Sequence, residues 1–206
     1  MSDDRNRQDV ERRIADALEA EKAREAVAIA LDAYGGEWFG YLVDSAKSKQ
    51  DADEIYGRFS LDLVEGVADF RQKSTFRTWG YAVLRNARNQ FYRKGNRRAR
   101  RKKPLEEYDE LSQIVDRTRT STNEWKKTSV KDAFARLIRQ ELDPEDRDIV
   151  TLRVDRKLDW KEVARVMLEG SDPAGDAIGR ESRRVRKRFE RAKEKIRDLA
   201  RENDLL

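Results

Sequence analysis

The residues from Ser74 to Lys94, STFRTWGYAVLRNARNQFYRK, interleave aromatic and cationic side chains in one run of helical character. At 100° per residue, one side of this helix collects Phe76, Val83, Leu84, Ala87 and Phe91. A second stripe, rotated by roughly a third of a turn or more, collects Arg77, Tyr81, Arg85, Arg88 and Tyr92. Cations contact phosphates, and flat rings stack on unpaired bases. The second stripe therefore predicts a nucleic-acid contact, with a solvated helix face as the alternative.

A second set of polar and cationic side chains begins the last helical stretch: Arg180, Ser182, Arg183, Arg184, Arg186, Lys187, Arg188 and Arg191. Arginine can bond guanine O6 and N7 in a bidentate way, and serine tolerates any base. A shorter amphipathic stretch and a turn precede this set, which is the order of a helix-turn-helix. We expect the first of these side chains to meet base edges and the later cations to meet phosphates.

Two groups of carboxylates could hold magnesium in a nuclease. They are Asp51, Asp53 and Glu54, and Asp143, Glu145 and Asp146. Each group lies where a helix cap would place it, without a glycine-rich phosphate loop nearby. The chain has no Cys and no His, which excludes disulfides, Cys/His zinc sites, thiol nucleophiles and histidine bases. We therefore expect no enzyme, no bound metal and no cofactor.

The charge of the 206-residue chain is unevenly distributed, although its formal net value is only +5. Eight of the eleven residues from Arg93 to Lys103 are basic, and so are ten of the eighteen from Arg180 to Arg197. Residues 105–124, with six acids and two arginines, separate these blocks. This pattern predicts two polyanion-binding surfaces joined by a tether. The N-terminus lacks an apolar signal region and no long apolar stretch exists, so we expect a soluble cytoplasmic protein without membrane insertion.

Helical periods dominate the whole sequence, and we find no convincing strand period, so the chain is predicted to be all-α. In the first half we expect helices over 9–33, 37–48, 51–67 and 75–94. Tyr34-Gly35-Gly36 is expected to break the first run, and Asp51 or Asp53 to cap the third helix. The stretch FRQKS, 70–74, is expected to be a loop.

After Lys94 the periodicity is lost for about 30 residues. The second half then predicts helices over 132–142 and 144–157, with Asp143-Pro144 at the start of the latter. The next helix, over 158–168, carries Asp159 and Glu162 at the spacing of a capping box. The predicted organisation is an N-terminal helical extension (1–24), a helical domain (25–94), a linker (95–129) and a helix-turn-helix domain (130–206).

In this order the two halves resemble a bacterial RNA polymerase sigma factor of the extracytoplasmic-function (group 4) type in the sigma-70 family. The segment 51–94, with its acidic start DADEI, Phe70, the FRTW tetrad and LRNAR, is similar to region 2. The segments FARLIRQELDPEDRDIVTLRVDRKLDWKEVARVM and RVRKRFERAKEKIRDL are similar to region 4. The resemblance covers roughly residues 25–94 and 130–200.

The resemblance implies a transcription initiation factor that joins core RNA polymerase through the β′ clamp and the β flap. Core-binding residues would be Asp51, Asp53, Glu54, Ile55, Arg58 and Asp62. Residues that grip the −10 promoter element would be Arg71, Gln72, Lys73, Ser74, Arg77, Trp79, Tyr81, Arg85, Asn86, Arg88 and Asn89. The last helix, with the eight residues named above, would read the −35 element. An anti-sigma factor is a further partner that the family implies.

Two departures from the family pattern stand out. Gly57-Arg58 replaces the usual glutamine and acid of the core-binding helix, where a neighbouring acid such as Asp62 would have to compensate the inverted charge. About ten extra residues separate Met167 from Arg180, so the recognition helix is expected to start earlier, near Asp172-Pro173. The alternative function is a stand-alone helix-turn-helix regulator that never joins polymerase and reads two half-sites as a dimer.

Overall fold

The protein, seen here in a computed structural model, is described at residues 2–93, 113–118, 138, 140–168 and 175–203. Throughout these ranges the regular structure is helical and contains no strand, which confirms the all-α prediction. The chain forms two compact units. Unit 1 holds the described residues up to 118, and unit 2 holds those from 138 onward. Most of the basic block 93–103, most of the expected linker and most of the expected helix 132–142 lie outside the described residues.

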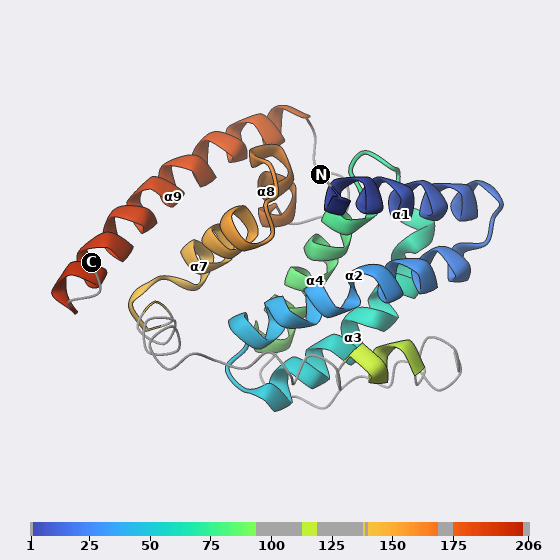
Figure 1. Ribbon diagram of the computed structural model, residues 1–206, viewed down its shortest axis with the longest axis horizontal. Coiled ribbons are helices and arrows are strands. Elements are labelled where there is room, and N and C mark those ends of the chain that lie inside the picture. The colour runs from blue at the N-terminus through green and yellow to red at the C-terminus, as the bar shows by residue number, and fades with distance from the viewer. Residues whose placement is uncertain (1, 94–112, 119–137, 139, 169–174, 204–206) are drawn as a thin grey trace. The chain divides into compact units, whose positions relative to one another are not determined.

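In its described part, unit 1 contains four long helices, which are shown in blue to green in Figure 1. They are α1 (Ser2–Glu19), α2 (Ala23–Ser45), α3 (Lys49–Gly66) and α4 (Phe76–Arg93), with a short 3-10 turn at Val67–Asp69. Helix α2 packs against the other three, and α4 also packs against α1 and α3. A further helical segment, residues 113–118, buries Ile114 and Val115. This segment falls inside the stretch that the sequence analysis read as a linker.

The core of unit 1 is aromatic. Trp38 of α2 is fully buried and makes edge contacts with Phe59 of α3 and Tyr81 of α4, at ring-centroid distances of 5.3 and 6.5 Å. Gly80 lies directly against this ring, because a Cβ built on it would come within 2.2 Å of Trp38 Cζ2. Helix α4 therefore reaches α2 closely only where it has no side chain.

Three sequence expectations about the helices of unit 1 are wrong. The expected single helix over 9–33 is divided into α1 and α2, because the chain turns between Glu19 and Ala23, where Glu21 has a φ of 58° in the left-handed region. Helix α2 continues through Gly35 and Gly36, since the apolar surface on both sides of the pair is buried and holds the helix together. A Cβ on Gly35 would lie 2.8 Å from the Tyr56 hydroxyl, so the glycine serves close packing. Helix α3 is capped by Ser48, whose Oγ accepts a hydrogen bond from the amide of Asp51 at 3.0 Å.

Unit 2 contains α7 (Pro144–Val150), a π-helical turn at Thr151–Asp155, α8 (Trp160–Met167) and α9 (Gly175–Glu202). Helices α7 and α8 both pack on α9, and the expected helix-turn-helix pair is present as α8 and α9. The fully buried Ile149, Leu152, Val163 and Val185 form its core. Asp159 and Glu162 form the expected capping box, and Asp143-Pro144 begins α7 as expected. Helix α9 begins five residues before Arg180, which agrees with an early start of the recognition helix.

Candidate nucleic-acid interfaces

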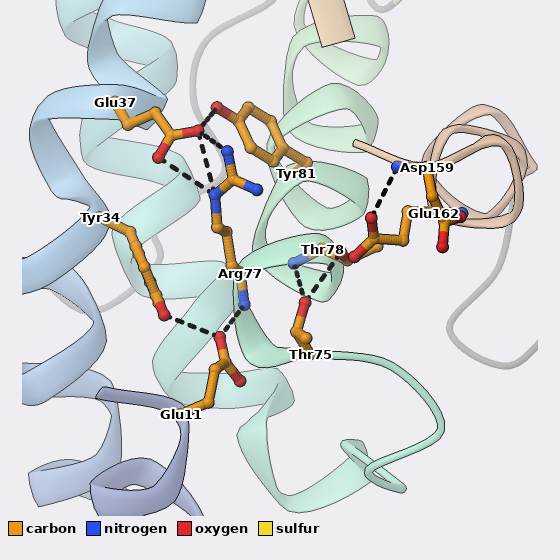
Figure 2. Close-up of polar contacts among 9 residues, drawn as sticks. All are labelled: Glu11, Tyr34, Glu37, Thr75, Arg77, Thr78, Tyr81, Asp159 and Glu162. Carbon is orange, nitrogen blue, oxygen red and sulfur yellow. Dashed lines mark hydrogen bonds and ion pairs between the residues drawn. The ribbon is translucent and has the colours of Figure 1, made fainter. Parts of the chain in front are cut away.

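Four of the five residues of the Arg/Tyr stripe of α4 are buried, and Tyr92 is half-buried, so the prediction that the stripe is an exposed face is wrong. Arg77, Arg85 and Arg88 are at most 9% exposed, and Tyr81 is fully enclosed. Figure 2 shows the reason: Glu37 of α2 lies opposite the stripe. Its carboxylate accepts hydrogen bonds from Arg77 Nε at 3.1 Å and from the Tyr81 hydroxyl at 2.7 Å. The alternation of Arg and Tyr is therefore explained by polar packing between α2 and α4.

Further along α4, Arg88 donates to the Tyr41 hydroxyl of α2 at 3.2 Å and lies over its ring at 5.6 Å. Tyr92 of the stripe donates to Asp51 at 2.9 Å and accepts from the amide of Lys47 at 2.8 Å. Burial, ahead of the neighbouring Asp51 charge, raises the pKa of Tyr92 above its ordinary value. These contacts join both ends of the α2–α3 turn to α4.

Among the predicted −10 residues, those of the loop before α4 are the most accessible. Arg71, Gln72 and Lys73 are exposed, and Ser74 is half-buried. Gln72 has a φ of 54°, in the left-handed region, so the loop turns sharply at its centre. The loop projects from an aromatic cluster in which Phe70 contacts Phe76 and Trp79 at 5.1 and 5.2 Å.

The other predicted −10 contacts of α4 are less accessible. Trp79 is only 6% exposed, which contradicts its prediction as an exposed contact because Phe70 and Phe76 enclose its ring. Asn86 and Asn89 are half-buried, and the Asn89 carbonyl oxygen accepts from Arg88 at 3.4 Å.

A carboxylate that the sequence analysis did not single out lies at the start of α4. Glu11 of α1 accepts from the amides of Phe76 and Arg77 at 2.7 and 3.0 Å, and from the Tyr34 hydroxyl at 2.9 Å (Figure 2). Burial, and then the Glu11 charge, raise the pKa of Tyr34 well above its ordinary value. No sequence signal identifies Glu11, because it is one of many acids on the polar side of α1.

The predicted polymerase-contact residues lie on α3, but not all on its surface. Ile55 is fully buried in the core, so its prediction as a surface contact is wrong. Glu54 is exposed, and Asp51 and Asp53 are half-buried. Arg58 pairs with Asp62 on the next turn at 3.8 Å and donates to Gln90 of α4 at 3.2 Å. Arg58 therefore has an acid partner one turn further along α3.

In unit 2, two of the eight predicted −35 residues are held by acids from α7. Arg188 contacts Asp146 at 2.7 Å and Glu145 at 3.0 Å, and Arg184 contacts Glu145 at 2.5 Å. The hydrogen bonds that Arg184 donates to Glu181 and then to Glu145 raise the pKa of its guanidinium, so it stays charged. The second group of carboxylates that could have suggested a metal site, Asp143, Glu145 and Asp146, therefore consists of partners of arginines. We name this group, Glu145, Asp146, Arg184 and Arg188, the α7–α9 clamp.

Four more of the predicted −35 cations lie on the outer side of α9. Arg180, Arg183, Lys187 and Arg191 are all exposed and recur every three or four residues, away from the buried Val185. We name these four residues the outer stripe. Arg180 pairs with Asp176 at 2.8 Å and lowers the pKa of that exposed carboxyl. Arg183, Lys187 and Arg191 have no ion pair with any residue that the structure describes.

The last two predicted −35 residues differ from the outer stripe. Arg186 is exposed but lies over the ring of Trp160 at 5.6 Å, a cation–π contact that joins α9 to α8. Ser182 is only 7% exposed and faces the core of unit 2, so its prediction as a base contact is wrong.

Comparison with known proteins adds no assignment: no protein-family model matches the chain, and no curated protein is significantly similar to it. Among the described residues, no group of three or more acidic side chains is arranged to hold a metal ion. No helix in the described part of the chain has the length and apolar character that crossing a bilayer takes.

Proposed function

We propose that this protein is a sigma-type transcription initiation factor, which joins core RNA polymerase, recognises the −10 and −35 elements of promoters and assists their melting. The observation that carries the proposal is the outer stripe of α9. It lies on the second helix of a helix-turn-helix pair, and three of its cations are unpaired among the described residues. The resemblance of both halves of the sequence to regions 2 and 4 of that family supports the wider assignment.

The dimensions of the outer stripe suit a duplex. Eleven residues separate Arg180 from Arg191, which at 1.5 Å per residue gives a length of about 16 Å. A major groove is about 12 Å wide, so a helix that enters it can place its first cations at base edges and its later ones at phosphates. In this arrangement Arg183 and Lys187 are the best candidates for base contacts, and Arg191 for a phosphate.

The loop 71–74 is the candidate −10 contact in unit 1. It combines two cations, Arg71 and Lys73, with the neighbouring ring of Phe70, which is half-buried and borders the loop. Cations that follow a backbone beside a ring that can receive a base are the elements of single-strand recognition. The buried Arg77, Tyr81, Arg85 and Arg88 are assigned no direct contact in the proposal.

The decisive experiment is transcription in vitro on a promoter library with core polymerase, with and without this chain. Start sites that appear only with the chain support a sigma factor. Specific DNA binding without co-elution with core polymerase would instead favour the stand-alone regulator. No specific binding at all would refute both.

A variant series tests the role of the outer stripe. Because each lost phosphate contact removes about one unit from the slope of log affinity against log salt concentration, we expect Arg191→Ala to flatten that slope. Arg183→Ala should relax sequence preference, with a loss of about 1–3 kcal/mol on the best promoter. Arg201→Ala is the matched control, since it removes the same charge eighteen residues, or five turns, further along the same side of α9. Equal effects of Arg183→Ala and Arg201→Ala would refute the assignment.

A further inference from the structure

The first turn of α4 leaves no amide without a partner. A helix begins with amides that have no acceptor within the helix. Here the Thr78 amide donates to Thr75 Oγ1 at 3.1 Å, in the manner of an N-cap. The amides of Phe76 and Arg77 donate to the two carboxylate oxygens of Glu11 at 2.7 and 3.0 Å. The next amide, of Trp79, makes the first bond within the helix, to Thr75 at 3.1 Å.

The Glu11 carboxylate is itself fixed in place. Tyr34 of α2 donates its hydroxyl to Glu11 Oε1 at 2.9 Å. Helix α1 is anchored on unit 1 by Val10, Ile14 and Ala17, which are all buried. Three helices therefore meet at one carboxylate, and the position of α1 determines where α4 begins.

The beginning of α4 in turn holds the loop 71–74. The amide of Phe76 donates to Glu11, and its ring packs on those of Phe70 and Trp79, at centroid distances of 5.1 and 4.9 Å. Phe70 and Thr75 are the two ends from which the loop projects. We propose that Glu11 is a positioning residue for this loop, so that helix α1 presets the surface that captures unpaired bases of the −10 element. This inference rests on the proposed function, and it assigns a role to the N-terminal extension.

The same carboxylate determines where a strand phosphate can bind. The positive end of a helix attracts anions, and phosphate often occupies it. At α4 that place is taken by Glu11, with both oxygens bonded to amides. A DNA strand must therefore be held by the side chains of the loop, Arg71 and Lys73, rather than by the end of the helix.

The test compares Glu11→Ala, Glu11→Gln and Ile14→Val in the full chain. Glutamine keeps an acceptor without the charge, whereas Ile14→Val loosens the buried packing of α1 and leaves the Glu11 carboxylate in place. The probes are two fluorescent pools of random sequence, a 12-nucleotide single strand and a 30-base-pair duplex, titrated at low salt. We expect Glu11→Ala to lose at least fivefold in single-strand affinity, Glu11→Gln to recover part of it, and Ile14→Val to keep it. Duplex affinity, carried by α9, should not change.

Hydrogen exchange on the same proteins separates this inference from the proposed function. Glu11→Ala should speed exchange of peptides that cover residues 70–79 and leave those of α3 at the wild-type rate. Unchanged or tighter single-strand binding by Glu11→Ala overturns the positioning role, and so does an equal loss in Ile14→Val. If the wild type binds neither pool, the proposed function fails. In that case, faster exchange in Glu11→Ala that is confined to residues 70–79 still supports the positioning of the loop. Faster exchange in Glu11→Ala that spreads over all of unit 1 overturns it.

Discussion

The close contact between Gly80 and Trp38 predicts that Gly80→Ala lowers the stability of unit 1, whereas a control substitution in the same unit, Gly36→Ala, raises it. In Gly80→Ala the new methyl group would start 2.2 Å from Trp38 Cζ2 and 2.7 Å from Cε2. Carbon atoms pack at about 3.5–4.0 Å, so the ring or the helix must move by more than 1 Å. The ring cannot easily yield, because Trp38 is fully buried among Tyr34, Phe59 and Tyr81.

Two opposing terms set the magnitude. Alanine is favoured over glycine inside a helix by about 1 kcal/mol. Overpacking of a core typically costs about 1–3 kcal/mol, and an enclosed ring places Gly80→Ala at or beyond the upper end. We therefore expect a net loss of about 2 kcal/mol or more. Gly36→Ala is the control: its methyl group meets nothing within 4 Å, so unit 1 should gain about 0.5–1 kcal/mol.

Native-state hydrogen exchange is the suitable assay, because it reports the free energy of unfolding for each unit separately. The slowest amides of α2 and α4 should lose protection in Gly80→Ala, and those of α9 should keep theirs. Gly35→Ala should fall between the other two variants, since its methyl group would lie 2.8 Å from the Tyr56 hydroxyl, a smaller overlap than the one at Gly80. A Gly80→Ala protein as stable as the wild type, alongside a stabilised Gly36→Ala, would refute the packing argument.

Two further predictions concern titration and capping. Because the pKa of Tyr34 in the folded protein is raised above the ordinary 10.0, the folded state keeps a proton that the unfolded chain loses, and stability falls as pH rises beyond about 10. The free energy of unfolding, measured with urea between pH 9.5 and 11, should therefore fall less steeply in Tyr34→Phe than in the wild type, by on the order of one tyrosine ionisation. An equally steep fall in both proteins would contradict the raised pKa of Tyr34. Asp159→Ala should destabilise α8 by about 1 kcal/mol, whereas Asp159→Asn should cost less, because Asp159 caps two amides at 2.7 and 2.8 Å. Equal melting temperatures for Asp159→Ala and wild type would contradict this.

The local features of the fold were predictable from the sequence. The capping box at Asp159, the start of α7 at Pro144 and the loop before α4 are each encoded within a few residues. Gly35-Gly36 misled the prediction because a breaker signal is local, whereas the close packing that keeps α2 continuous depends on Tyr56, far along the chain.

The candidate site was less predictable than the fold. A helical wheel shows which side chains share a face, but not which helix covers that face. The stripe of α4 that suggested a binding surface is buried against Glu37 of α2. Two arginines of α9 likewise pair with Glu145 and Asp146 in the α7–α9 clamp. In both places the opposing acid comes from another helix, 39 to 42 residues away. The exposure of the outer stripe could be predicted from the sequence because, among the described residues, no acid of another helix pairs with it; its one ion pair, Arg180–Asp176, lies within α9.

The contact of Glu11 with α4 also bears on how the chain is made. Sixty-five residues separate Glu11 from Phe76. At a synthesis rate of about 5–20 residues per second, Glu11 is made roughly 3 to 13 s before the amide that it caps. Helix α1 can coil within microseconds, but it cannot complete its part of unit 1 on the ribosome until α4 has followed it out.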